Sequence, residues 1–274
     1  MPDRHNGWQL LDAELAAWVA EGKTATLWWR DDDAGSHSVE ITRLINLHIE
    51  FAVPLTLAVV PCAATRSLAD AILPYPGISP VVHGYAHINH APPDAKQAEF
   101  GAHRPLAVMQ EELEKAMAAM QQLFGDRLQP VFAPPWNRIA PELVPALPAL
   151  GFCGLSSFQS TADRHPARGL VQTNCHVDLL YGLSKITPRP ASDVLQDLTA
   201  HLYTRRRRGG GHAANDVTLF GKPVPKTFDP EEPTGILTHH LAHSAQSWEL
   251  LQMLFKRLAQ PGCPVRWLAC GEVF

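Results

Sequence analysis

The chain has 274 residues, of which 46% are hydrophobic and 18% charged, and its formal net charge is −4. A chain of this size buries a core large enough to fold without disulfides, and its slight negative charge argues against general nucleic-acid binding. Five cysteines without a C-x-x-C pair indicate reduced thiols. No stretch approaches the roughly 20 apolar residues of a membrane span, and acidic residues interrupt the N-terminal segment where a signal peptide needs an apolar run. The sequence therefore predicts a cytoplasmic protein.

Helix-like and strand-like segments alternate along the chain. Apolar spacing and stop signals predict helices at residues 10–20, 39–50, 65–73, 107–124, 141–150, 190–204 and 245–259. Buried strands are expected at residues 26–30, 54–60, 79–82, 130–132, 152–158, 170–178, 235–238 and 265–268. This alternation predicts a parallel sheet, closed or open, in one domain that spans residues 1–274.

Residues 205–233 interrupt the alternation. Four arginines, Arg205 to Arg208, precede three glycines and then several prolines. A segment this polar is expected to form a long surface excursion rather than core. The arginines can bind an anionic partner such as phosphate or a membrane surface, but a solvated loop is the favoured interpretation.

Three consecutive carboxylates, Asp31, Asp32 and Asp33, follow directly after the strand expected at residues 26–30. Like charges this close repel one another, and an inward-facing carboxylate lowers stability unless something compensates it. A divalent metal can do so, with one carboxylate as ligand and a neighbour left free as a base. An acidic solvated loop is the alternative, but α/β proteins place their sites at strand ends, which favours a metal site.

Histidines follow two other expected strands. His83 and His87 are four residues apart, and on a helical turn this spacing lets both imidazoles reach one zinc ion. His239 ends a strand and is suited to protonate a leaving group near neutral pH. Chance spacing and ordinary loop histidines are the alternatives for each motif alone, and His90 fits a surface loop as well as a cleft. Because parallel strands end at one rim, the three motifs together predict one site.

The segment Ala133-Pro134-Pro135-Trp136 follows the strand expected at residues 130–132. A rigid Pro-Pro turn can present an aromatic wall and a backbone N–H to a ligand, and it is equally acceptable as a plain connection to a helix. The candidate substrate-binding residues are Trp136, Pro135, Arg104 and His90.

In this order, the motifs resemble those of the polysaccharide deacetylases of carbohydrate esterase family 4. The family has an Asp-Asp pair, His-x-x-x-His, an Arg-x-Pro-Tyr type turn, an Asp-containing motif and Leu-x-His. The corresponding segments here are Asp32-Asp33, His83 to His87, Ala133 to Trp136, the segment around Asp178, and Leu237-Thr238-His239. The matches extend from about residue 26 to residue 242.

The resemblance implies a distorted (β/α)7-type barrel and a metal-dependent hydrolase that removes an acetyl or similar acyl group from an N-acylated sugar or a related small amide. It implies that Asp33, His83 and His87 hold a divalent metal, namely zinc. Asp32 would be the general base that activates the metal-bound water, and His239 the general acid. The backbone N–H near Trp136 would help to stabilise the oxyanion.

The sequence leaves three questions open: the register of the Asp pair, the partner of the base and the function. Asp31-Asp32 is the other register of the pair, although the small residue Ala34 after Asp33 favours Asp32-Asp33. The family's third motif carries an arginine that pairs with the base, and Ala133 stands there, so Arg30 or Arg104 would have to replace it. The function is a zinc-dependent deacetylase, a metal-independent C–N amidohydrolase of the same fold, or a non-catalytic carbohydrate-binding protein. A small-molecule or oligosaccharide substrate is expected, and the sequence gives no oligomeric state.

Overall fold

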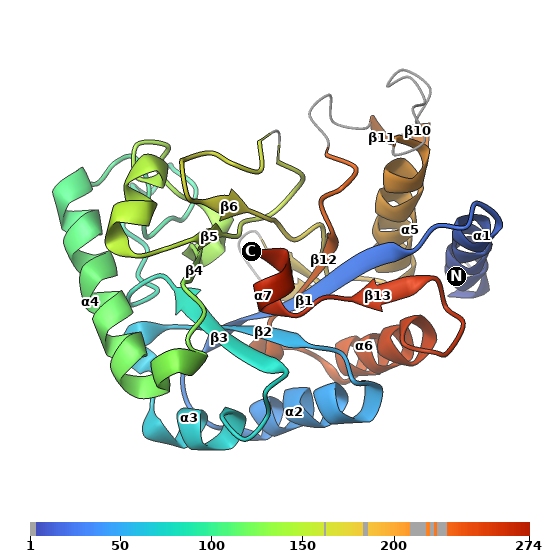
Figure 1. The fold of residues 1–274 in the computed structure, drawn as a ribbon, viewed down its shortest axis with the longest axis horizontal. Coiled ribbons are helices and arrows are strands. Elements are labelled where there is room, and N and C mark those ends of the chain that lie inside the picture. The colour runs from blue at the N-terminus through green and yellow to red at the C-terminus, as the bar shows by residue number, and fades with distance from the viewer. Residues whose placement is uncertain (1–3, 162, 183–185, 209–217, 220–221, 224–228) are drawn as a thin grey trace.

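Parallel strands curl into a barrel-like sheet with helices around it in this computed structural model, which describes residues 4–161, 163–182, 186–208, 218–219, 222–223 and 229–274 (Figure 1). The strands of the main sheet are β1 Ala25–Ala34, β2 Leu55–Val59, β3 Ile78–His83, β4 Val131–Ala133, β5 Gly154–Leu155, β6 Val171–Gln172, β7 Val177–Asp178, β12 Thr234–Thr238 and β13 Val265–Trp267. They are hydrogen-bonded in the order β6-β5-β4-β3-β2-β1-β12-β7, and β13 also pairs with β1. Every pairing in this sheet is parallel.

Helices connect most of the strands and cover the outside of the sheet (Figure 1). The α-helices are α1 Arg4–Ala20, α2 Val39–Phe51, α3 Arg66–Ile72, α4 Leu106–Phe124, α5 Ala191–Arg208, α6 Ala245–Leu258 and α7 Cys270–Val273. The 3-10 helices are η1 Pro61–Ala63, η2 Gly125–Arg127, η3 Pro135–Asn137, η4 Val144–Leu150 and η6 His240–Ala242. Two antiparallel pairs stand apart from the main sheet: β8 Leu180–Gly182 with β9 Ile186–Pro188, and β10 Thr218–Leu219 with β11 Lys222–Pro223.

One extended run, residues 171–178, closes the ring of strands. Its first part pairs with β5, and the N–H groups of Thr173 and Cys175 continue that pairing with carbonyls of residues 155 and 157. Its last part, β7, pairs with β12, which in turn pairs with β1. The positions around the ring are therefore β1 to β5, the 171–178 run and β12. This seven-position ring confirms the predicted distorted (β/α)7-type barrel.

Side chains of β1 alternate between the barrel interior and the helix layer, as the strand period requires. Trp29 faces outward and packs edge-on against Phe255 of α6, with ring centroids 4.7 Å apart. Trp28 faces inward and meets the ring of Phe274 at 5.6 Å. Phe274 also packs beside Gly154, where β5 begins. The C-terminus therefore fills the barrel at the end where strands begin, and the opposite end is free for polar residues.

Two of the expected helices differ from the prediction in type or in length. Residues 141–150 do not form an α-helix; the segment narrows to the 3-10 helix η4, because Pro145 and Pro148 remove N–H donors. The helix predicted at 190–204 continues to Arg208, so Arg205 and Arg206 belong to α5 and are buried.

The two buried arginines are held by acceptors on neighbouring elements. Arg205 donates to the carbonyl and the hydroxyl of Thr26 at 2.7 and 2.8 Å, and Arg206 donates to the carboxylate of Glu14 on α1 at 2.7 and 3.0 Å. The long stems pack while the guanidinium groups reach oxygen atoms. The expected excursion is thus helix at its start, and most of its remainder (209–217, 220–221 and 224–228) lies outside the described residues.

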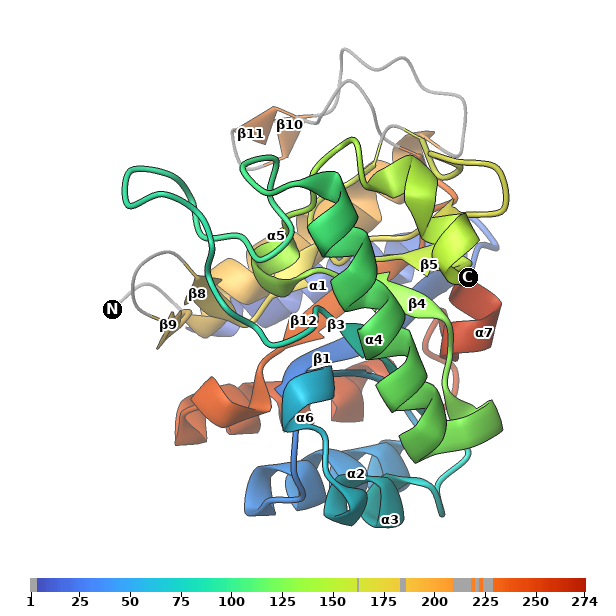
Figure 2. The same cartoon turned by 90° about the vertical axis from the view of Figure 1, so that its left-hand side faces the viewer.

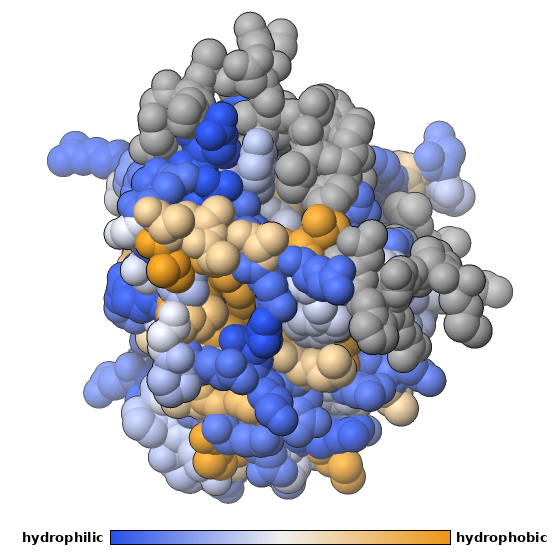
Figure 3. Space-filling view, turned by 90° about the vertical axis from the view of Figure 1, so that its right-hand side faces the viewer, coloured by the Kyte–Doolittle hydropathy of each residue, from blue (hydrophilic) through white to orange (hydrophobic). Residues whose placement is uncertain are grey.

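Figure 3 shows the face on the α1 side, where hydrophilic side chains surround smaller apolar areas. In the described part of the chain, no helix combines the length and apolar character needed to cross a membrane.

A partly buried histidine of α5 makes the stability of the fold sensitive to pH. His201 stacks on His176 with ring centroids 3.9 Å apart, and its Nδ1 lies 2.9 Å from the hydroxyl of Thr234. Burial, aided by the charges of His176 and Arg205, lowers the pKa of His201 well below its usual value. Unfolding restores a pKa of about 6.5, so the unfolded chain gains a proton that the folded chain does not bind.

The free energy of unfolding should therefore fall as the pH drops below about 6.5. His201→Gln should reduce this loss by up to about 1.4 kcal/mol per pH unit, as measured by urea denaturation at a series of pH values. His103→Gln, which removes an exposed histidine, is the control and should keep the wild-type slope. An unchanged slope in His201→Gln would contradict the prediction.

Candidate metal centre

Acidic and imidazole side chains collect at the end of the barrel where β1, β3, β7 and β12 end. Figure 2 shows β1, β3 and β12 close together in the centre of the view, between α4 and α6. The strand register sets Asp31 beside Thr238, His83 beside Ala133, and Asp178 beside Leu237. The motifs predicted from the sequence therefore meet at one rim.

Asp33, His83 and His87 form a compact group of potential ligand atoms. Asp33 Oδ1 lies 3.1 Å from Nε2 of His83 and 3.1 Å from Nε2 of His87, and the three donor atoms lie within 4.8 Å of one another. His83 Nδ1 lies 2.9 Å from the carbonyl oxygen of Ala133, so that carbonyl would accept a proton on Nδ1 and Nε2 would be the atom available to a metal. One carboxylate and two imidazoles suit a zinc site with open positions.

Contacts within this group determine its charge. Burial acts to raise the pKa of Asp33, but hydrogen bonds with His83 and His87 outweigh it and hold the pKa well below the usual range. Burial acts to lower the pKa of His87, and the contact with Asp33 reverses this and raises it. Negative charge is therefore concentrated on Asp33, where a cation would bind.

The end of β1 directs its three carboxylates to three different places. A register shift between Asp31 and Ala34 interrupts the pairing with β2, and Asp33 has a left-handed backbone with φ of 72°. This irregularity turns Asp33 toward the histidines, as bulges near sites often do. Asp31, fully buried, accepts hydrogen bonds from the Thr238 hydroxyl at 2.6 Å and from His240, whose Nδ1 is 2.5 Å away. The structure thus brings Asp33 to the histidines and places Asp31 on the helix side of the strand.

Asp32 points into the barrel and is paired with an arginine of the same strand. Arg30 Nη2 donates to Asp32 Oδ2 at 3.0 Å, and Nε lies 2.8 Å from Oδ1 without hydrogen-bond alignment. The same guanidinium donates to Ser156 Oγ at 2.7 Å and to Asn137 Oδ1 at 2.5 Å. Burial acts to lower the pKa of Arg30, but the charge of Asp32 prevails and the pKa is raised.

Of the two arginines considered as partners of Asp32, Arg30 is the one that contacts it. Arg104 instead donates to both carboxylate oxygens of Glu112 on α4, at 2.8 and 2.7 Å, and to the carbonyl of Glu99. Ala133, at the place of the family arginine, contributes its carbonyl to His83.

His239 lies beside Asp178, on the other side of the rim. The distance between His239 Nδ1 and Asp178 Oδ1 is 3.7 Å. Burial raises the pKa of Asp178, and the charge of His239 opposes that rise. His239 also acts on Asp33 and helps to lower the pKa of that carboxyl. His239 therefore lies near both Asp178 and the potential ligand group of Asp33, His83 and His87.

The turn after β4 forms an aromatic wall next to this group. Trp136 and Asn137 both have left-handed backbones, with φ of 55° and 56°, a conformation that non-glycine residues adopt only when the surroundings impose it. The ring of Trp136 lies 4.4 Å from that of His87, centroid to centroid. Pro135 is buried under the turn, and His90 is exposed in the loop between β3 and α4.

The expectation that His83 and His87 share a helical turn is wrong. Within the described residues 4–161, His83 ends β3 and residues 84–88 form a bent loop without helix. Gly84 and His87 have left-handed backbones, with φ of 66° and 57°. The two imidazoles converge because the loop folds back.

Sequence reasoning did not assign Ser156, Asn137 or Glu99 to the site. Ser156 and Asn137 hold Arg30, and Glu99 binds the loop that carries His87. Asn137 had a signal, since it directly follows the Pro-Pro-Trp turn. Ser156 and Glu99 had none, because their contacts join segments that are distant in sequence or separated by an irregular loop.

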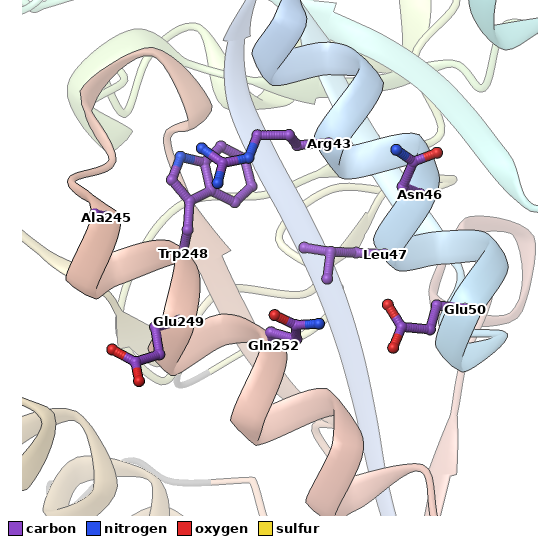
Figure 4. A pocket seen from close by; sticks show the side chains of 8 residues that line it. All are labelled: Arg43, Asn46, Leu47, Glu50, Ala245, Trp248, Glu249 and Gln252. Carbon is purple, nitrogen blue, oxygen red and sulfur yellow. The ribbon is translucent and has the colours of Figure 1, made fainter.

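A surface groove of about 320 Å³ lies elsewhere, between α2 and α6 (Figure 4). Arg43 stacks over Trp248 there, with its Cζ 4.9 Å from the ring centroid. The groove is lined by the outer faces of the two helices, and no predicted site residue belongs to it.

No family model and no curated protein matches the chain, whereas several solved structures have a similar fold. One, from Mycobacterium smegmatis and assigned as a polysaccharide deacetylase, has a TM-score of 0.59 and 13% identity over 92% of this chain and 89% of that chain. A peptidoglycan deacetylase from Bacillus subtilis has a TM-score of 0.51 and 10% identity over 91% and 90%. An allantoinase has a TM-score of 0.52 and 12% identity over 92% and 90%. The chain therefore has the fold of the polysaccharide deacetylases, as its motifs predict.

The three directions of the Asp triplet give a prediction about metal binding. Asp33→Asn should weaken zinc binding by about 100-fold, because it would remove the negative charge from the potential ligand group. Asp31→Asn should retain the wild-type zinc stoichiometry, because Asp31 lies on the other face of β1. Isothermal titration of the metal-stripped full chain with zinc measures both. Loss of zinc binding in Asp31→Asn but not in Asp33→Asn would contradict the assignment.

A second prediction concerns the buried ion pair. Arg30→Met should lower the free energy of unfolding by about 3–5 kcal/mol, because it leaves Asp32 buried without its cation. Arg104→Met, in which the remaining Glu112 is partly exposed, should have a smaller effect. Urea denaturation measures the free energy of unfolding of both variants. Equal losses would contradict the prediction that the Arg30–Asp32 pair matters more for stability than the Arg104–Glu112 pair.

Proposed function

We propose that the chain is a metal-dependent hydrolase of the polysaccharide-deacetylase type, formed as one catalytic domain, that cleaves the acyl C–N bond of an N-acylated sugar or a related small amide. The observation that supports this most strongly is the juxtaposition of three groups at one rim. A potential ligand triad of Asp33, His83 and His87, a carboxylate held by an arginine, and a histidine beside a partly buried carboxylate are what hydrolysis of an amide requires.

Asp33, His83 and His87 would hold the metal, for which we propose zinc. The donor set fits zinc, and the carbonyl of Ala133 would accept the Nδ1 proton of His83 while Nε2 binds the metal. A bound divalent cation supplies a Lewis acid that favours deprotonation of water and polarises the acyl carbonyl.

Asp32 is the proposed general base. Arg30 fixes the position of its carboxylate from within the same strand, so the base does not have to be ordered when substrate binds. Each carboxylate oxygen has a second lone pair in addition to the one directed at the guanidinium. Asp32 can therefore accept a proton from water while it stays paired.

His239 is the proposed general acid. The carboxylate of Asp178 faces its Nδ1 at 3.7 Å, which orients the ring with Nε2 directed away from Asp178. Such a ring can donate a proton to the leaving nitrogen. The backbone N–H of Trp136 is the proposed donor to the oxyanion, and its indole with Pro135 the proposed wall of the substrate site. Arg104 and His90 stay candidates for contacts with larger substrates.

The proposal predicts loss of turnover on chelation and its recovery on addition of zinc. The assay is acetate release from a panel of N-acetylated monosaccharides, chitooligosaccharides and small amides, together with ammonia and carboxylate release from ureides. Asp32→Asn should retain zinc and lose turnover by about 100- to 10,000-fold. Turnover that survives chelation would favour the metal-independent amidohydrolase, and sugar binding without turnover would favour the carbohydrate-binding protein.

A further inference from the structure

The loop that carries His87 needs support that its own sequence does not supply. Residues 84–88 lack the hydrogen bonds of a helical turn in the described structure, and the left-handed backbone of His87, with φ of 57°, is uncommon for a residue other than glycine. Such a conformation persists only where neighbouring groups impose it. The group that does so here comes from further along the chain.

Glu99 places its carboxylate inside this loop. Its Oε1 accepts the N–H of Ala86 at 2.7 Å and that of Ile88 at 3.5 Å, and its Oε2 accepts the N–H of Tyr85 at 3.1 Å. The residue is only 1% exposed. Successive N–H groups that converge on an anion form a nest, in which the charge stabilises a backbone that otherwise has no internal bonds.

The space around Gly84 shows how closely the carboxylate fits. A Cβ at Gly84 would lie 2.1 Å from Glu99 Oε2 and 2.5 Å from Pro135 Cγ, and the φ of this residue is 66°. Only glycine leaves room for the carboxylate and accepts this backbone conformation. The loop and Glu99 therefore fit together as a unit.

Glu99 is itself held on both sides. Its carbonyl accepts a hydrogen bond from Arg104, which is paired with Glu112 of α4. The next residue, Phe100, pairs with the segment after η3 through the N–H of Ala140, at 2.6 Å. The carboxylate thus connects the ligand loop to α4 and to the segment that follows Trp136.

We propose that Glu99 is a positioning residue for the metal centre, which takes the place of a helical turn in bringing His87 to the same ion as His83. This inference rests on the proposed function, since it requires that Asp33, His83 and His87 bind a metal. Glu99 is not a ligand: both of its oxygens face backbone N–H groups. Its negative charge also lies behind His87 and favours a cation at the imidazole.

The test compares Glu99→Gln with a matched control, Glu232→Gln. Glu232 is also 1% exposed and accepts backbone N–H groups, from Asn174 at 2.8 Å and Thr161 at 3.3 Å, but it binds no part of the 84–88 loop. The metal-stripped full chain is titrated with Co²⁺, whose visible absorption reports the coordination geometry, and with Zn²⁺ in competition. Thermal unfolding of the metal-free proteins is measured in parallel.

Glu99→Gln should weaken Co²⁺ and Zn²⁺ binding by about 10- to 100-fold and change the Co²⁺ spectrum, whereas Glu232→Gln should lower only the unfolding temperature. The side chain of Glu99→Asp is too short to bring its carboxylate to the three N–H groups. This variant should behave like Glu99→Gln and replaces it in the test if Glu99→Gln does not fold. Wild-type affinity and spectrum in the Glu99 variants, or an equal loss in Glu232→Gln, would overturn the inference. If the wild type binds neither metal, both the inference and the proposed function fail. The titration of the wild type alone distinguishes this outcome from a failure of the inference only.

Discussion

The constraint on which this site depends is the repulsion between three adjacent carboxylates at the end of one strand. At about 7 Å and an effective dielectric constant near 20, each like-charged pair is destabilised by roughly 2 kcal/mol. Asp31, Asp32 and Asp33 cannot share one environment, and the irregular end of β1 gives each its own. Asp31 binds Thr238 and His240, Asp32 binds Arg30, and Asp33 faces the two histidines. Because each partner lies in a different direction, neighbouring carboxylates have different contacts, and the proposed base and ligand can be adjacent in sequence.

Arg30 makes most of the contacts that hold Asp32 in place. A fully buried guanidinium is tolerated only when nearly every N–H has an acceptor, and these come from Asp32, Ser156 and Asn137. The ion pair therefore also connects β1 to the end of β5 and to the turn η3. The guanidinium that pairs with Asp32 comes from the same strand, two residues away, and not from position 133. Ala133 instead contributes its backbone carbonyl to His83.

Most of the rim was predictable from the sequence because parallel strands end together. The strand before Asp31, the strand ending at His83 and the strand before His239 each had a clear apolar pattern, so their convergence followed from topology. What sequence could not supply were contacts between distant segments. Nothing local pairs Arg30 with Ser156, or Arg206 with Glu14, and a run of arginines resembles a solvated loop until the acceptors around it are known. The four-residue spacing of His83 and His87 correctly predicted that their imidazoles lie close together. A loop, and not the expected helical turn, brings them there.

The site therefore divides into two parts with different mechanical properties. Asp32, Asp33 and His83 lie on or directly at the ends of central strands, whose positions are fixed by the barrel core. His87 and Trp136 lie on loops with left-handed residues, and their rings are in contact at a tilt, with centroids 4.4 Å apart. A shift of the turn after β4 would therefore act on His87, the proposed ligand, through this ring contact. Under the proposed function, substrate that packs against Trp136 would act on the proposed metal ligands from the loop side, while the proposed base Asp32 stays fixed on its strand. Changes in the two loops would then alter metal affinity and substrate preference together, while Asp32, Asp33 and His83 keep their positions at the strand ends.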